Sequence, residues 1–464
     1  MKLSQLHKIY PLFFLAPFFL YEDWLLSTIL LVVGLILINI EKISHSIISL
    51  EWREIVFFIY AFHMLFGERH FGYVGFEPLF ITEIVIAILT ISYANDLIRV
   101  RRVLFVYYLL VAIGLSFAFI YFFQHGLDAI RDSFMLLYAF WVPLVYHIFR
   151  SEKQYDLFFS LLKLFIVLKA IAYCYEAAMI ILGYQSITFE GFRFGVGYVL
   201  PSLIVIALFL PLKRIGWKYK ILSLLMIPAV FTIFHRSIFL GIILAILIIF
   251  ISGGVELKRT IIKYGIVSLI MLVGFLIYYN SIIDVNIFDI LEAKSSLDEG
   301  NINFRFISWQ YVLDNFYDHF LLGYGVGRPV MYVYQNVFYP TVDLSYFAIR
   351  DSGGNAQPHN SYLNILTRFG VLIFPIFLYA IFQPLFKIIK NFHKKRVNGM
   401  EPYTRYLLLI GFLMIMYVLA FFNVVLEGPH HSFPFWMSIG MLLSYGRSGN
   451  FTPKIIRIEK VVSN

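Results

Sequence analysis

The side chain with the clearest catalytic potential is His359, at the start of a long apolar stretch. It follows Pro358, and Asn360 or Ser361 could cap a helix that begins there. The positive end of a helix dipole disfavours a charged imidazole, so we expect His359 to stay neutral and able to accept a proton. A neutral imidazole suits general-base catalysis. A surface His at a membrane boundary is the alternative interpretation of this pattern.

Isolated arginines lie beside the apolar stretches, away from the Lys-rich loops. Arg236 occupies a short turn between two apolar stretches, where a charge is costly and therefore a candidate for function. Arg305 lies four residues before Trp309, and anchoring through a cation–π contact is its alternative interpretation. Arg193 and Arg131 lie at other helix ends. Several guanidinium groups on one face could bind a diphosphate, because each can hold phosphate oxygens in a bidentate way.

Three patterns that could indicate a cofactor or a metal are better explained otherwise. The run Gly323-Tyr324-Gly325-Val326-Gly327 lacks the βαβ unit of a nucleotide-binding loop, so we interpret it as a tight turn. His430 and His431 have no carboxylate at ligand spacing, and the single Cys174 excludes a Cys metal cluster. We therefore expect neither a cofactor nor a metal.

Membrane-spanning helices must position these residues. Of the 464 residues, 60% are hydrophobic and 14% are charged, whereas a soluble protein has about a quarter charged residues. We predict an all-α polytopic membrane protein with about 12 to 14 transmembrane helices, since each needs about 20 apolar residues. The candidate windows are 9–21, 24–40, 54–67, 77–95, 103–123, 130–149, 155–182, 196–212, 217–234, 237–252, 261–279, 360–386, 405–424 and 431–446.

The distribution of Lys and Arg orients these windows. Both residue types concentrate in the loops that follow every second window, and cytoplasmic loops carry such an excess. Both termini are therefore predicted to be cytoplasmic. Topology then accounts for most of the net charge of +9, and we expect no nucleic-acid partner. The predicted parts are a transmembrane bundle, a large extracytoplasmic loop, C-terminal transmembrane helices and a cytoplasmic tail: 1–279, 280–358, 359–446 and 447–464.

The large extracytoplasmic loop should contain short helices, because a structureless loop of this length would be unusual. Residues 303–318 have helical periodicity that places Trp309, Leu313 and Phe316 on one side. We predict a helix there, lying on or near the membrane surface.

Motifs within residues 230–375 occur in the order known from one protein family. They are His235-Arg236-Ser237, Arg305-Phe306-Ile307-Ser308-Trp309, the segment from His319 to Gly327, His359-Asn360-Ser361-Tyr362-Leu363 and Arg368-Phe369-Gly370. Together they resemble the O-antigen ligase and polymerase superfamily. In that family an Arg and a Trp open the large periplasmic loop, a Leu-Leu-Gly-x-Gly-x-Gly segment follows, and a His-Asn or His-Ser starts the next helix. The family has Ser before the Arg of the earlier turn, and this chain has His235 instead. The amino-terminal third matches the family only in helix count and length.

The resemblance implies a GT-C-like, metal-independent, inverting glycosyltransferase. It would transfer a glycan from undecaprenyl diphosphate to a sugar hydroxyl, at the periplasmic or outer face of the bacterial inner (plasma) membrane. By position, Arg236 and Arg305 would hold the diphosphate, and His359 would take the proton of the acceptor hydroxyl. Arg193 and Arg131 are further diphosphate candidates. Fixed positive charge can stabilise a departing diphosphate without a metal.

The resemblance leaves the acceptor open. A ligase moves finished polymer onto the lipid A-core, whereas a polymerase adds polymer to the next lipid-linked repeat unit, and other members make capsule or exopolysaccharide or decorate protein. The implied partners are the glycan donor, the acceptor, membrane lipids and, as a further candidate, a chain-length regulator. The acceptor-facing surface is expected within residues 328–357. The acceptor or loop candidates are Trp309, Asn360, Tyr324 and Arg328.

A transporter or flippase of lipid-linked oligosaccharide is the alternative function. Such proteins typically show internal repeats and charged residues at the bilayer midplane. No repeat is evident in this sequence, and the notable charges lie at helix ends. Lys169 and Glu176, seven residues apart on one helix face, could pair and favour the transporter.

Overall fold

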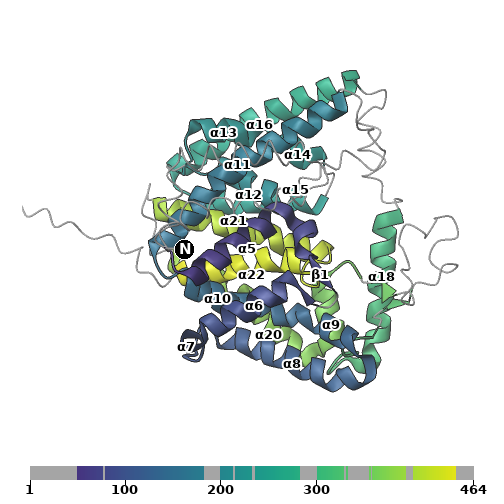
Figure 1. The fold of residues 1–464 in the computed structure, drawn as a ribbon. Helices are drawn as coiled ribbons and strands as arrows, with labels where there is room; N and C mark the ends of the chain where they lie inside the picture. Colours follow the sequence, from purple (N-terminus) through teal and green to yellow (C-terminus); the bar gives the residue numbers. More distant parts are fainter. Residues whose placement is uncertain are drawn as a thin grey trace, which may run out of the picture.

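The computed structural model of the chain is almost entirely helical (Figure 1). It describes residues 50–76, 79–181, 199–212, 215–232, 236–282, 300–328, 331–332, 355–356, 358–392 and 401–445. The predicted windows 9–21 and 24–40, the tail 447–464 and the candidate Arg193 lie outside these residues. The all-α prediction is confirmed.

Among the described residues, 5 helices are long and apolar enough to cross a membrane. They are α8 (Phe105–His125), α11 (Glu152–Ile181), α16 (Val255–Ile282), α20 (Ser361–Phe392) and α21 (Glu401–Phe422). Three shorter helices are also apolar: α6 (Ile81–Ser92), α12 (Val199–Leu208) and α15 (Arg236–Ser252). The other α-helices are α5 (Trp52–Gly72), α7 (Ala94–Leu97), α9 (Leu127–Leu137), α10 (Trp141–Ile148), α13 (Trp217–Leu224), α14 (Met226–Thr232), α18 (Gly300–Phe316) and α22 (Pro429–Tyr445). Each predicted window within the described residues overlaps one of these helices or a consecutive pair.

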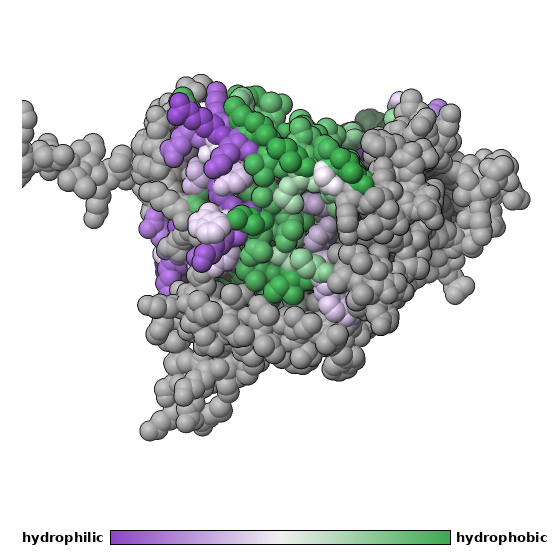
Figure 2. All heavy atoms as spheres, turned by 90° about the horizontal axis from the view of Figure 1, so that it is seen from above, coloured by the Kyte–Doolittle hydropathy of each residue, from purple (hydrophilic) through white to green (hydrophobic). Residues whose placement is uncertain are grey.

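The outward surface of α16 is apolar and fits contact with lipid. Ile266, Leu269 and Ile270 are 55%, 62% and 66% exposed, and Ile277 is 66% exposed. A continuous exposed surface of this kind would be costly in water. Figure 2 shows a broad apolar band over one face of the molecule, with hydrophilic side chains gathered at one end. This distribution is that of a multi-pass membrane protein.

Aromatic side chains fill the centre of the bundle, where α5, α10 and α22 pack together. Trp141 is fully buried, stacks on Tyr60 with ring centroids 5.1 Å apart, and meets the edge of Phe433 at 4.8 Å. Gly440 lets α22 approach α10 closely, because an added Cβ would lie 2.7 Å from the Cβ of Val145. Small residues commonly permit such approaches between membrane helices. This core fixes α22, whose first turn adjoins the candidate site.

Helix α20 is broken at Gly370, which has φ 74. The break would leave backbone groups without partners, and that is costly inside a membrane protein. The segment 320–325 supplies those partners. The N–H groups of Tyr324 and Gly325 donate to the carbonyls of Thr367 and Arg368 at 2.8 and 3.0 Å. In the other direction, the N–H groups of Val371 and Leu372 donate to Phe320 and Leu321 at 2.9 and 3.3 Å.

The three glycines of the motif make this docking possible. Gly323, Gly325 and Gly327 all have positive φ, at 73, 84 and 81, a conformation that only Gly adopts readily. There is also no space for a side chain. An added Cβ would lie 2.4 Å from the backbone of Arg368 at Gly323 and 2.2 Å from the ring of Tyr121 at Gly325. The prediction of a tight turn is confirmed.

The predicted loop helix is present as α18, followed by a short 3-10 turn at Tyr317–His319. It runs crosswise to the bundle helices at one end of the molecule (Figure 1). Of the apolar side chains that the sequence placed on one side of this helix, Phe316 is buried and Leu313 is 42% exposed. The buried stripe consists of Ser308, Val312 and Phe316. Ser308 can occupy this stripe because its hydroxyl donates to the Arg305 carbonyl at 2.9 Å.

Two short strand pairs complete the described structure. Strand β1 (Gly75–Phe76) pairs with β2 (Leu79–Phe80), and β3 (Met331–Tyr332) pairs with β4 (Asn355–Ala356), both antiparallel. The second pair joins the two ends of the segment in which the acceptor-facing surface was predicted. The rest of that segment lies outside the described residues.

Candidate active site

His359 lies in a turn, and hydrogen bonds fix the chain both before and after it. Its own φ is 47, a left-handed conformation that is uncommon for a residue with a side chain. Before it, the Pro358 carbonyl accepts a hydrogen bond from the Trp309 indole N–H at 2.5 Å. After it, the Asn360 side chain accepts from the Leu363 N–H at 3.0 Å. Asn360 therefore caps α20, as the sequence predicted.

Helix α18 brings Arg305 to this turn. Arg305 and Trp309 lie one helical turn apart, and the Trp309 ring also packs on Phe421 of α21 at 5.7 Å. The docked segment 320–325 fastens the far end of α18 to α20. Among the described cation–π contacts, the Arg305–Trp309 pair does not occur. Trp309 instead connects α18, α21 and the His359 turn.

Arg236 lies near Arg305 and belongs to a third helix. It is the first residue of α15, and its side chain is exposed. The neighbouring Ser237 hydroxyl accepts a hydrogen bond from Asn423 Nδ2, at the end of α21, at 3.0 Å. Gly241 keeps the two helices close, since an added Cβ would lie 3.0 Å from the Cα of Ile415. The packing of α15 on α21 thus sets the position of Arg236.

His359 lies in the electrostatic field of Arg305, and Arg305 lies in that of Arg236. Burial, and then the charge of Arg305, lower the pKa of His359 from 6.5 to about 4. Burial, and then the charge of Arg236, lower the pKa of Arg305. His359 is therefore neutral at pH 7 beside the Arg305 guanidinium, which the Arg236 guanidinium repels. An anion placed between these guanidinium groups would relieve the repulsion.

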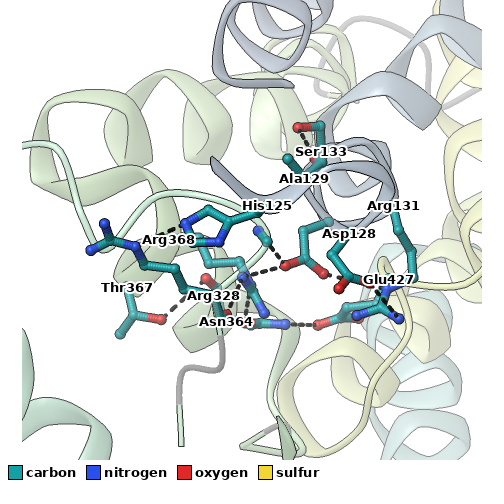
Figure 3. Close-up of polar contacts among 12 residues, drawn as sticks. His125, Asp128, Ala129, Arg131, Ser133, Arg328, Asn364, Thr367, Arg368 and Glu427 are labelled. Atoms are coloured by element: carbon teal, nitrogen blue, oxygen red, sulfur yellow. Dashed lines mark hydrogen bonds and ion pairs between the residues drawn. The ribbon is translucent and has the colours of Figure 1, made fainter. Parts of the chain in front are cut away.

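A chain of polar side chains connects Glu427, Asn364 and Arg368 (Figure 3). Glu427, in the turn between α21 and α22, accepts hydrogen bonds from Ser361 Oγ at 2.6 Å and from Asn364 Nδ2 at 2.9 Å. Asn364 Oδ1 in turn accepts from Arg368 Nε at 3.1 Å. Arg368 is fully buried and forms an ion pair with Asp132 of α9 at 2.6 Å. Ser361, Asn364 and Arg368 thus occupy successive turns of one face of α20.

The same chain reaches the segment after the glycine motif. Asp132 Oδ2 accepts from the Gly327 N–H at 2.8 Å, and the Arg328 carbonyl accepts from Arg368 Nη1 at 3.0 Å. The Arg328 side chain is exposed and donates from Nε to His125 Nε2 at 3.1 Å. Arg328 therefore marks the point where the loop of residues 328–357 leaves the docked segment.

The other predicted site residues occupy different surroundings. Arg131 makes ion pairs with Asp128 at 3.4 Å and with Asp132 at 3.7 Å, so it joins the cluster around Arg368. The Tyr324 ring packs on His319 at 5.1 Å, and its hydroxyl is buried with no hydrogen-bond partner among the described residues. Within the described part of the chain, no group of three His, Cys, Asp or Glu side chains could hold a metal ion.

Lys169, which the sequence offered as a transporter charge, is a core residue. It is 1% exposed, donates from Nζ to the Phe66 carbonyl at 3.1 Å, and lies 4.5 Å from the Phe66 ring centroid. It joins α11 to α5. The side chain of Glu176, its predicted partner, lies outside the described residues.

Sequence reasoning missed Asp132, Asn364 and Glu427 as members of the site. The spacing of Asn364 and Arg368 could have indicated a pair on one helix face. Glu427, just before Gly428 and Pro429, was visible only as part of a turn. Nothing in the sequence links Asp132 to Arg368.

Residues 221–378 match the family model described as O-antigen ligase. Over this stretch the chain, a multi-pass membrane protein, is similar to the O-antigen ligase family. The matched stretch contains Arg236, Arg305, Trp309, the glycine motif and His359, all of which the structure gathers at one end of the bundle. A match to this family favours an enzyme that handles lipid-linked glycans. No curated protein matches this chain.

Proposed function

We propose that this protein is a metal-independent, inverting glycosyltransferase. It transfers a glycan from undecaprenyl diphosphate to a sugar hydroxyl in the biosynthesis of a bacterial surface polysaccharide. The observation that supports this most strongly is the meeting of α15, α18 and α20, where a neutral His359 lies in the field of Arg305, and Arg305 lies in that of Arg236. Two cations and one neutral base are the groups that such a transfer requires.

The proposed step uses each of these groups. Arg236 and Arg305 bind the diphosphate of the donor. The acceptor oxygen attacks the anomeric carbon from the face opposite the diphosphate, so the configuration inverts. The bond between that carbon and the diphosphate oxygen breaks, and its electron pair leaves with the diphosphate. The acceptor hydroxyl gives its proton to His359 Nδ1 or Nε2, and the two guanidinium groups stabilise the charge that develops on the leaving group.

The electrostatics of the site would couple base strength to donor binding. Without an anion, burial and Arg305 keep the pKa of His359 at about 4, and a base of this pKa is weak. A bound diphosphate would offset the charge of Arg305 and raise the pKa of His359 toward its ordinary value. His359 would then be a stronger base when the donor is in place, and it would resist protonation when the donor is absent.

We further propose that the site faces the periplasm or cell exterior, with both termini in the cytoplasm. The support is the excess of Lys and Arg in the loops at the other ends of the helices. Tyr324 and Arg328 remain our candidates for contact with the acceptor, because they lie where the loop of residues 328–357 begins. Trp309 and Asn360 hold the His359 turn, and we assign them that role instead. The ion-paired Arg131 is not part of the proposed diphosphate clamp.

The proposal is tested in a strain that lacks the protein, complemented with wild type, His359→Ala or Lys163→Ala at matched expression. Lys163 lies on α11 with its Nζ 5.4 Å from the Tyr219 ring centroid, so this control removes a polar side chain away from the three converging helices. The surface glycans are then separated on a gel. We expect His359→Ala to match the null strain and Lys163→Ala to match wild type. A single-repeat product in the null strain would indicate a polymerase, and long polymer left on the lipid carrier would indicate a ligase. A normal ladder from His359→Ala would contradict the proposal.

A further inference from the structure

The His359 turn requires support from outside itself. A left-handed conformation is unfavourable for a residue with a side chain, and it persists where surrounding contacts impose it. The contact from Trp309 to Pro358 holds the residue before His359. Ser361, two positions after His359, is fully buried.

Ser361 is held by the turn between α21 and α22. Its Oγ accepts hydrogen bonds from the Val425 and Leu426 N–H groups at 2.8 and 3.1 Å. It lies 2.6 Å from Glu427 Oε2 and 3.1 Å from the Asn423 carbonyl, to either of which its hydroxyl can donate. The first residue of α20 is therefore fixed by a segment distant in sequence.

Glu427 also fixes the second turn of α20. One carboxylate oxygen binds Ser361 and the other binds Asn364, so a single side chain spans the first two turns of the helix. A negative charge is favourable at a helix N-terminus. Burial raises the pKa of Glu427, whereas the hydrogen bonds from Ser361 and Asn364 and the charge of Arg368 act in the opposite direction. These neighbours therefore partly offset the effect of burial on the Glu427 carboxyl.

We propose that Glu427 is a positioning residue for His359. Its hydrogen bonds with Ser361 and Asn364 fix the position of the start of α20. They thereby orient the His359 imidazole toward the acceptor hydroxyl, and Glu427 itself contacts neither substrate. This inference rests on the proposed function for its effect on transfer. The hydrogen bonds that carry it are independent of that function.

The first test compares Glu427→Ala and Glu427→Gln with the control Ser432→Ala. Ser432 lies near the start of α22 and is fully buried. Its hydroxyl donates to the Val425 and Leu426 carbonyls of the same turn instead of contacting α20. We expect Glu427→Ala to lower kcat about 100-fold, the scale of a misplacement of about 1 Å. Glu427→Gln should fall between this variant and wild type, because an amide can still accept from Ser361 but presents N–H groups to Asn364 Nδ2. Ser432→Ala should keep wild-type kcat, and all three variants should bind the lipid-linked donor with wild-type affinity.

The second test is an NMR titration of the His359 imidazole, assigned by comparison with His359→Ala. In Glu427→Ala the turn should loosen and admit water, so the pKa of His359 should rise from about 4 toward its ordinary value. Ser432→Ala should leave the titration unchanged. Glu427→Gln serves both tests if Glu427→Ala does not fold.

Two results would overturn the positioning role. One is a wild-type kcat and titration in both Glu427 variants. The other is an equal loss in Ser432→Ala, which would show that the turn needs Glu427 only for stability. If His359→Ala transfers normally while Glu427→Ala shifts the titration, the proposed function fails and the positioning role stands.

Discussion

Replacing Arg305 by Gln should raise the pKa of His359 in the protein without donor. Burial and the Arg305 charge together lower that pKa from 6.5 to about 4. A fall of this size corresponds to a penalty of about 3 kcal/mol against the charged imidazole. Burial is the larger of the two causes, so Arg305 accounts for less than half of the fall. Its removal should place the pKa between about 4 and about 5.

The measurement is an NMR titration of His359 in wild type, Arg305→Gln and the control Arg131→Gln. The control removes the same charge from the cluster around Asp132, where Arg131 pairs with two carboxylates. We expect an upward change only in Arg305→Gln. Addition of inorganic diphosphate to wild type should act in the same direction, because the anion offsets the Arg305 charge.

Two results would refute this reasoning. An unchanged pKa in Arg305→Gln would show that Arg305 does not act on the imidazole. An equal rise in Arg131→Gln would show that the effect belongs to the overall charge of the protein and not to a specific neighbour.

The remaining predictions concern stability, measured as thermal unfolding in detergent. Between about pH 4 and 6.5, His359 binds a proton more readily in the unfolded state than in the folded state. The free energy of unfolding of wild type should therefore decrease as the pH falls through this window. A pH dependence in His359→Asn as steep as that of wild type would contradict this. Gly325→Ala should lower the free energy of unfolding by about 2 kcal/mol or more, since it adds a clash with Tyr121 to the strain of a positive φ. Gly126→Ala, at a positive φ in open space, should lower it less. Equal losses would count against the docking of the glycine motif on α20. Arg368→Met should lower the free energy of unfolding by about 3–5 kcal/mol, because it leaves buried Asp132 without its main partner. Arg131→Met removes a partly exposed partner and should lower it less. The reverse order would show that the buried pair is not the stabilising one.

The sequence predicted those features of the site that depend on neighbouring residues. Apolar window length predicted helices throughout the described chain, and the order Pro358-His359-Asn360 predicted a capped helix start. Both follow from local rules of capping and hydropathy. The sequence also predicted a helix over residues 303–318, and the structure places one at residues 300–316. Leu313 faces outward, and near a membrane an exposed Leu is not penalised, so hydrophobicity does not identify the buried face.

The features that could not be predicted depend on residues far apart in the chain. The break at Gly370 is tolerated because the segment 320–325 satisfies its backbone groups. A glycine in an apolar helix gives no indication of such a partner. The pairing of Asp132 with Arg368, and of Glu427 with Ser361, likewise requires the packed arrangement of α9, α20 and α22. The approach of Arg236 to Arg305 depends on how α15 packs against α21.

The most direct test of the account is a single-turnover transfer by purified protein, with a lipid-linked glycan donor, an acceptor and a metal chelator. Donor binding and transfer are measured separately for wild type, His359→Ala and Arg305→Met. We predict that wild type transfers in the chelator, that His359→Ala binds the donor with wild-type affinity but does not transfer, and that Arg305→Met loses donor affinity. Transfer by His359→Ala at the wild-type rate would contradict the central claim that His359 accepts the proton of the acceptor hydroxyl.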